Sequence, residues 1–157
     1  MFAFPSGLCV SLMAGATLLA QTGQSPRSLE ITTETTNNGQ AYRLTVRNIS
    51  EKNIHGYVLK FQYTSASTGE NMGVRCHTIF KPAKNGVAQY FRPGQVLHDR
   101  KDQFIPVDAA GQPAQYTVSV DSVVFEDGSS EGPAESRESA VLEGMIREQN
   151  RAAKSAN

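Results

Sequence analysis

The stretch from residue 57 to residue 64, Tyr-Val-Leu-Lys-Phe-Gln-Tyr-Thr, constrains the fold more than any other part of the chain. Large side chains occupy every second position, which is the period of a β-strand with one buried and one wet face. Aromatic residues at this density on one face need an apolar layer opposite them. The sequence therefore predicts a strand at the centre of a β-sandwich, with these side chains pointing inward: Tyr57, Leu59, Phe61 and Tyr63.

Two shorter segments upstream show the same period. Residues 29–34 alternate apolar with charged or hydroxyl side chains, and residues 42–47 place Tyr, Leu and Val at every second position. Between them lies Asn38-Gly39, a pair that readily adopts the positive φ angles of a tight β-turn. These segments are expected to form a hairpin.

Downstream of residue 64 the strand signals are weaker. Candidate strands cover residues 75–80, 87–91, 96–98 and 104–107, separated by segments rich in Pro, Gly and Asn. Alternation returns at Tyr116, Val118 and Val120 and continues through Val123 to Phe125, with a break near Ser122. Such a break indicates a β-bulge or a change of face.

The acidic stretch 126–131, Glu-Asp-Gly-Ser-Ser-Glu, directly follows this last strand. Asp127-Gly128 at that position is typical of a hairpin turn. A calcium loop remains an alternative, but it would need alternating Asp or Asn ligands and a terminal bidentate Glu, a pattern that this stretch meets only in part. A phosphate-binding loop would need further glycines and a following Lys or Ser/Thr at fixed spacing, which are absent.

The period changes after Gly132-Pro133. Val141, Leu142, Met145 and Ile146 recur at helical spacing and predict a helix over residues 133–153. This apolar stripe is too short to sustain an isolated helix. Because the outward positions of the predicted strands are mostly polar, we expect the helix to be loosely attached and its four apolar residues to bind a protein partner.

The first twenty residues carry no charge, and their apolar stretch from Leu8 to Ala20 is shorter than a membrane span. They predict a secretory signal peptide, although the usual basic start is missing. Its removal would take Cys9 with it and leave Cys76 as the only cysteine of the exported chain. We expect Cys76 to be buried as a small apolar group, and intermolecular pairing of this lone thiol in an oxidising compartment is the alternative. The predicted organisation is a signal peptide at 1–20, a linker at 21–27, a sandwich at 28–132, a helix at 133–153 and a tail at 154–157.

Composition bounds the function. The chain has 157 residues, enough for one domain, and its fifteen basic residues balance fifteen acidic ones. No net field therefore favours nucleic acid or an anionic membrane, and no membrane span is expected after removal of the leader.

No motif for catalysis or for nucleotide binding is present, so no cofactor is expected. His55, His77 and His98 could form a metal site with Cys76. However, Cys76 and His77 are neighbours, and neighbours on a strand point to opposite faces. His98-Asp99 could be half of a catalytic triad, but such a pair occurs by chance in many sequences.

The order of these segments resembles that of uncharacterised secreted bacterial proteins with an immunoglobulin or fibronectin III-like fold. The resemblance covers about residues 28 to 152 and is carried by Val-Arg-Asn-Ile-Ser-Glu-Lys-Asn-Ile at 46–54, Arg-Pro-Gly-Gln at 92–95 and Val-Asp-Ser-Val-Val-Phe-Glu-Asp-Gly-Ser at 120–129. It implies a mainly β, Greek-key sandwich with one C-terminal α-helix, and it supplies no catalytic residues. The paired cysteines and the Trp of antibody domains are absent.

Two functions are compatible with these features. The first is an exported, non-catalytic interaction or structural module that binds a protein partner, or associates with itself, through a sheet face, its loops or the helix. The alternative is an accessory or enzymatic domain acting on an envelope polymer or small ligand. A deep pocket that gathers His98, Asp99 and basic side chains would favour the alternative.

Overall fold

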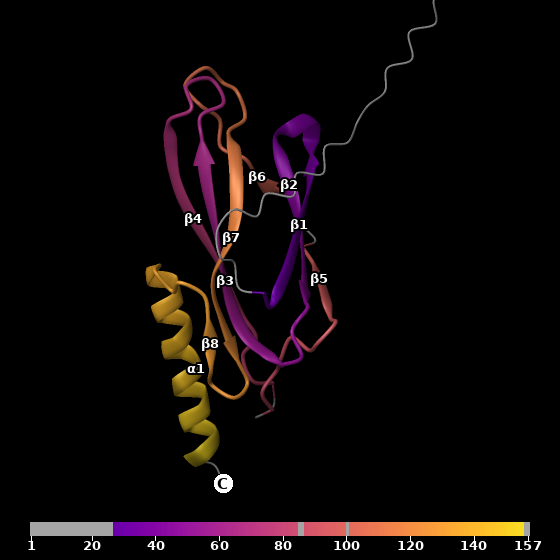
Figure 1. Cartoon of the computed structure of the whole chain (residues 1–157), viewed down its shortest axis with the longest axis vertical. Coiled ribbons are helices and arrows are strands. Elements are labelled where there is room, and N and C mark those ends of the chain that lie inside the picture. The colour runs from indigo at the N-terminus through magenta and orange to yellow at the C-terminus, as the bar shows by residue number, and fades with distance from the viewer. Residues whose placement is uncertain (1–26, 85–86, 100, 156–157) are drawn as a thin grey trace, which may run out of the picture.

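The computed structural model describes residues 27–84, 87–99 and 101–155 (Figure 1). Within these ranges the chain forms two antiparallel sheets and one C-terminal α-helix, which confirms the predicted mainly β fold. In the first sheet, β2 (Ala41–Asn48) pairs with β1 (Leu29–Thr36), β5 (Val96–His98) and β6 (Gln103–Phe104). The second sheet has the order β4 (Asn71–Phe80), β3 (Ile54–Thr64), β7 (Gln115–Phe125) and β8 (Ser130–Glu131), and α1 is Arg137–Ser155.

The predicted hairpin at Asn38-Gly39 is confirmed. β1 and β2 pair in antiparallel register from Leu29 with Asn48 to Thr36 with Ala41. A short 3-10 turn, η1 (Asn37–Gly39), joins them, and all three of its residues have positive φ. Asn and Gly tolerate this backbone region better than other residues, so the turn forms where the sequence places them.

The main core lies between the two sheets. Tyr57, Leu59, Phe61 and Tyr63 of β3 all point into it, as their alternation predicts. They meet β2 across the sandwich, where the ring of Tyr42 stacks on Phe61 at 5.2 Å between centroids. The core therefore follows the period-two pattern of the sequence. The inward side chains of β3 are buried between the sheets, and the residues next to them in sequence point to the opposite face.

The break near Ser122 is a β-bulge. Val58 of β3 pairs with Ser122 and Leu59 pairs with Val120, so Asp121 has no partner residue on β3. The extra residue changes the face that follows it. Val120 and Val123 both lie in the main core, whereas Asp121 contacts the segment that leads into α1.

Two strand predictions differ from the structure. Residues 87–91 form no strand and make only single bridges, Lys84 with Val87 and Ile54 with Phe91. Here the chain leaves the second sheet after β4 and crosses to the first sheet at β5, so pairing is limited to these two bridges, and of the bridged residues 87 and 91 only Phe91 is buried. The strand expected at 104–107 is reduced to Gln103–Phe104, and Val107 makes a single bridge with Pro113.

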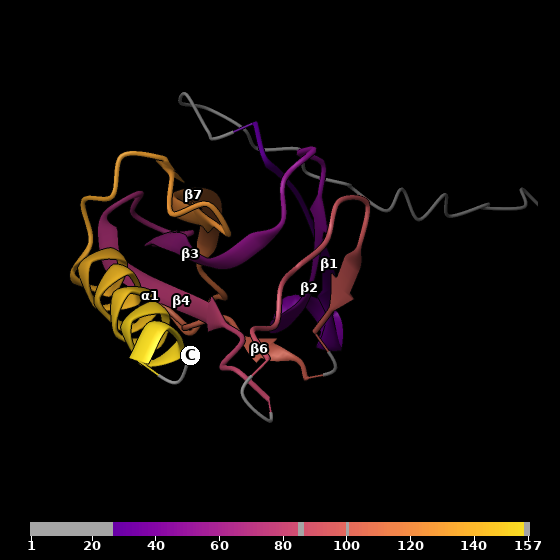
Figure 2. The same cartoon turned by 90° about the horizontal axis from the view of Figure 1, so that it is seen from below.

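The helix also differs from its predicted bounds. It begins at Arg137 rather than at residue 133 and continues through Ser155 rather than ending at 153. α1 lies against the second sheet on the side away from the first sheet (Figure 2). The predicted leader and most of the linker lie outside the described residues.

The hairpin predicted at Asp127-Gly128 joins β7 to β8. The Gly128 amide donates to the Phe125 carbonyl at 3.0 Å, the Phe125 amide donates to the Ser129 carbonyl at 2.9 Å, and Gly128 has φ of +82°. This backbone region is costly for residues that carry a Cβ.

Gly128→Ala should lower the free energy of unfolding by about 1 to 2 kcal/mol, because it forces an L-residue into the left-handed region. No atom would obstruct the new methyl group, so backbone strain is the only cost. Gly144→Ala in α1 is the matched control: its methyl group also meets nothing, and it should stabilise by about 1 kcal/mol through helix propensity. Urea unfolding of both variants measures the difference, and shifts of the same sign would contradict the turn conformation.

Candidate interaction groove

The terminal helix is docked, so the expectation that it is loosely attached is wrong. Leu142 and Ile146 are buried against Val58 of β3 and Val124 of β7. These two valines are apolar residues in outward positions of the second sheet, and they provide a second small core. Gly56 permits the close approach, since a Cβ there would lie 2.7 Å from Leu142 Cδ1.

The start of the helix is fixed by Asp121, the bulged residue of β7. Its buried carboxylate accepts hydrogen bonds from the Ser136 amide at 3.1 Å, the Ser136 hydroxyl at 2.6 Å and the Ser139 hydroxyl. The Ser139 hydroxyl also lies 2.8 Å from that of Ser122. The bulge thus turns a carboxylate toward the helix start, where it accepts from Ser136, just before the helix, and from Ser139 in its first turn.

Two effects act on the pKa of Asp121. Burial raises it, but the hydrogen bonds from Ser136 and Ser139 favour the ionised form, and the pKa lies below its ordinary value. The carboxylate is therefore charged at neutral pH and holds the helix start in that form.

The second half of the helix is fixed by Gln149. Its amide oxygen accepts from the Ala83 amide at 3.1 Å, and its Nε2 lies 3.0 Å from Nε2 of His55. If the amide nitrogen donates, His55 Nε2 is the acceptor and the ring is neutral. The buried imidazole packs against Phe80 and Tyr90, with ring centroids 5.6 and 5.1 Å away.

Burial lowers the pKa of His55, an effect that the Glu126 carboxylate partly opposes. The unfolded chain therefore takes up a proton first as the pH falls through about 6.5. The free energy of unfolding should decrease below that pH until the folded state also protonates. Urea unfolding at about pH 7 and about pH 5 should show this loss in the wild type and a smaller loss in His55→Gln. An equal loss in both proteins would contradict a role for His55.

A groove lies between α1 and β4. It has a volume of about 630 Å³ and is lined by Thr78, Phe80, Pro82, Arg137, Glu138, Val141 and Met145. Val141 is 50% exposed and Met145 is 41% exposed, although both belong to a docked helix. The structure thus divides the four predicted partner-binding residues: Leu142 and Ile146 hold the helix on the sheet, and Val141 and Met145 form one wall of the groove.

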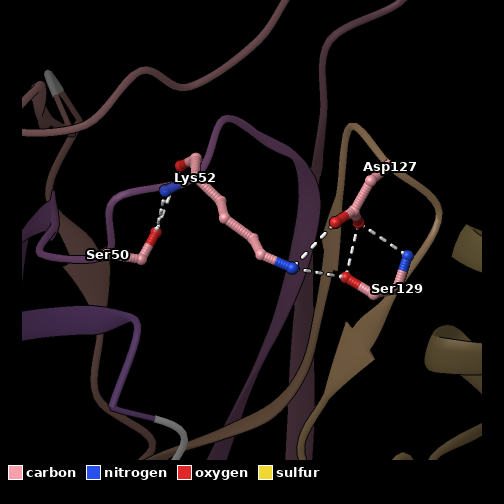
Figure 3. Close-up of polar contacts among 4 residues, drawn as sticks. All are labelled: Ser50, Lys52, Asp127 and Ser129. Carbon is pink, nitrogen blue, oxygen red and sulfur yellow. Dashed lines mark hydrogen bonds and ion pairs between the residues drawn. The ribbon is translucent and has the colours of Figure 1, made fainter.

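The acidic turn 126–131 is tied to the neighbouring loop (Figure 3). Lys52 Nζ lies 2.7 Å from a carboxylate oxygen of Asp127 and 3.2 Å from the Ser129 hydroxyl, and the Lys52 amide donates to Ser50 Oγ. The Ser129 amide donates to the other oxygen of Asp127 at 2.9 Å. Contact with Lys52, followed by the bonds from Ser129, keeps the pKa of Asp127 below its ordinary value. The carboxylate is engaged by the chain's own groups, as a structural turn requires.

The residues considered as metal ligands are dispersed. His55 lies under the end of α1, His77 packs beside Phe61 at 4.7 Å in the sandwich, and His98 lies 3.0 Å from the Thr45 hydroxyl in the first sheet. Cys76 packs on the opposite face of β4 from His77, near Val58 and α1, where it is partly buried. Across residues 27–84, 87–99 and 101–155, no three His, Cys, Asp or Glu side chains are grouped to hold a metal ion.

The groove does not contain His98 or Asp99. Asp99 accepts from the Lys101 amide at 3.1 Å and from the Gln103 side chain at 2.9 Å. The pair therefore lies at the edge of the first sheet, whereas the groove belongs to the second sheet and the helix.

Sequence patterns did not reveal the β4 side of the groove. Phe80 and Pro82 lie at the end of a predicted strand, and nothing local shows that a helix more than fifty residues later lies beside them. A better signal is the pair of outward valines, Val58 and Val124, whose apolar side chains are stabilised when another element packs over them.

Over the described part of the chain, no helix has the length and apolar character needed to cross a bilayer. No family model, curated protein or solved structure matches this chain.

Proposed function

We propose that this chain is an exported, non-catalytic interaction module that binds an extended polypeptide segment in the groove between α1 and β4. One observation carries the proposal: Val141 and Met145 stay exposed on a docked helix and form, with Phe80, the apolar part of a groove that Arg137 and Glu138 also line. An apolar surface of this kind is stabilised when a partner covers it. The groove runs beside β4, the terminal strand of its sheet, so an extended chain fits it better than a helix would.

We also propose an immunoglobulin-like arrangement for the sandwich. If the strands are lettered as in such domains, the first sheet gives A-B-E for β1-β2-β5 and the second gives C′-C-F-G for β4-β3-β7-β8. The strand order supports this assignment. The fold by itself does not select a function, which rests on the groove.

Export is proposed from residues 1–20. The intact mass of the protein purified from its native host should correspond to a chain that begins near Gln21. A full-length product in the cytoplasm would contradict export.

Site-specific photo-cross-linking tests the groove. Met145 is replaced by the photoreactive amino acid benzoylphenylalanine, and the control carries the same replacement at Arg147, which is exposed on the same helix but is not part of the groove. Illumination of cells, followed by mass spectrometry, should identify a peptide joined to position 145 and none joined to position 147. The absence of a product at 145, or equal products at both positions, would contradict the proposal.

A further inference from the structure

We infer that the segment that fills the groove belongs to a second copy of this chain, and that the two copies join by antiparallel pairing of their β4 strands. This inference rests on the proposed groove and names its occupant. It follows from three features of β4: an open edge, a self-complementary apolar face and complementary charges at its ends.

The first feature is the open edge. β4 is the last strand of its sheet and pairs with β3 along almost its whole length, from Asn71 with Thr64 to Phe80 with Gly56. Among the described residues, no backbone hydrogen bond joins the other edge of β4 to any segment. Its outward N–H and C=O groups can therefore pair with another strand.

The second feature is the distribution of apolar side chains along β4. Val74, Thr78 and Phe80 are separated by even steps and share the face on which α1 lies. Val74 is 50% exposed, and Met72, at the bulge beside it, is 36% exposed. One end of β4 thus carries a protruding apolar pair, Met72 and Val74, and the other end carries the apolar groove.

An antiparallel pair of identical strands brings these two ends together twice, once on each side of a two-fold axis. The register that places Val74 opposite Thr78 also places Met72 opposite Phe80. In this register Met72 and Val74 of one copy enter the groove of the other and approach its Val141 and Met145. The two-fold axis then passes beside Cys76, which faces Cys76 of the second copy.

The third feature is charge. Glu70 is exposed just before β4, and Lys81 and Lys84 follow β4 at its other end. In the same register, Glu70 of one copy falls beside Pro82 of the other, between these two lysines. On the opposite face of β4, this register places Arg75 of one copy opposite His77 of the other. Burial and the nearby Arg75 of its own chain lower the pKa of His77. The imidazole is therefore neutral at neutral pH and does not repel the Arg75 opposite it.

Sedimentation equilibrium of the purified chain tests the association. We expect a mass twice that of the chain, and Val74→Glu should raise the dissociation constant at least about tenfold, because it places a charge in the apolar groove of the partner. Val96→Glu is the matched control: Val96 is also an exposed valine, but it lies on β5 in the first sheet and does not line the groove. A monomeric wild type, or a dimer weakened equally by both changes, would overturn the inference.

Mild oxidation tests the register. Opposed residues of an antiparallel pair have Cα atoms about 4.5 to 5.5 Å apart, within the range that a disulfide spans. The dimer should therefore form a Cys76–Cys76 cross-link that Val74→Glu suppresses. A dimer that does not cross-link would overturn the register.

The two proposals fail in different ways. A purified monomer, together with a photo-cross-link from Met145 to a different protein, would overturn the second-copy inference and leave the groove as the binding site. The absence of any cross-link from Met145 would overturn both.

Discussion

Phe61→Ala should lower the free energy of unfolding by about 3 to 5 kcal/mol, a large part of the stability of a domain of this size. Phe61 is fully buried at the centre of the sandwich, where its ring lies 5.2 Å from Tyr42, 4.7 Å from His77 and 6.5 Å from Tyr116. Three neighbours from different strands cannot all move to fill the space that a methyl group would leave. Urea unfolding measures the loss.

Lys60→Ala is the control from the adjacent position. Lys60 points to the other face of β3, and its ammonium lies 3.7 Å from an exposed carboxylate, that of Glu135. A partly exposed pair of this kind contributes about 0 to 1 kcal/mol, so the variant should unfold at nearly the wild-type midpoint. Comparable losses in Lys60→Ala and Phe61→Ala would show that the faces of β3 are assigned wrongly.

The strands that alternate strictly could be predicted because a period of two is a local property. The inward face of β3 and the β1–β2 hairpin depend on neighbours in sequence and on one Asn-Gly turn, and both were predicted correctly. The break near Ser122 was also visible, since a bulge interrupts the alternation on its own strand.

The segments between β4 and β7 could not be predicted in the same way. Phe91 is held by a single bridge to Ile54, thirty-seven positions earlier, and the segment around it crosses between sheets. Its hydrophobic residues resemble those of a strand, but pairing there is decided by the route of the chain. Local propensity carries no information about that route.

The helix shows how a correct pattern can support a wrong inference. The helical spacing predicts its apolar stripe, but the mostly polar outward positions of the strands do not show where that stripe docks. Two residues, Val58 and Val124, are enough, because Gly56 lets Leu142 approach the sheet closely. Asp121 has no local sequence signal for its role, but it is buried and holds the start of the helix through Ser136 and Ser139.

The docked helix leads to a second large expected effect. A chain that ends at Gly132 should lose at least about 3 kcal/mol of stability, since burying a Leu or Ile side chain fully contributes about 1.5 to 3 kcal/mol. The truncation removes Leu142 and Ile146 and exposes Val58 and Val124. A loosely attached helix would instead leave the unfolding midpoint unchanged, so urea unfolding of the shortened chain distinguishes the two arrangements.

If the shortened chain fails to fold, substitutions at two adjacent helix residues of the full chain test the docking of the helix instead. Leu142→Ala should cost about 2 to 5 kcal/mol, because its side chain is enclosed between Gly56, Val58 and Val124. Val141→Ala, one position earlier but facing the groove, should change stability by no more than about 0.5 kcal/mol in the monomer. Equal effects of the two changes would mean that the helix does not present Leu142 to the sheet, and the groove would then lose the wall formed by Val141 and Met145. The stability difference between these adjacent residues therefore tests the surface on which the proposed function depends.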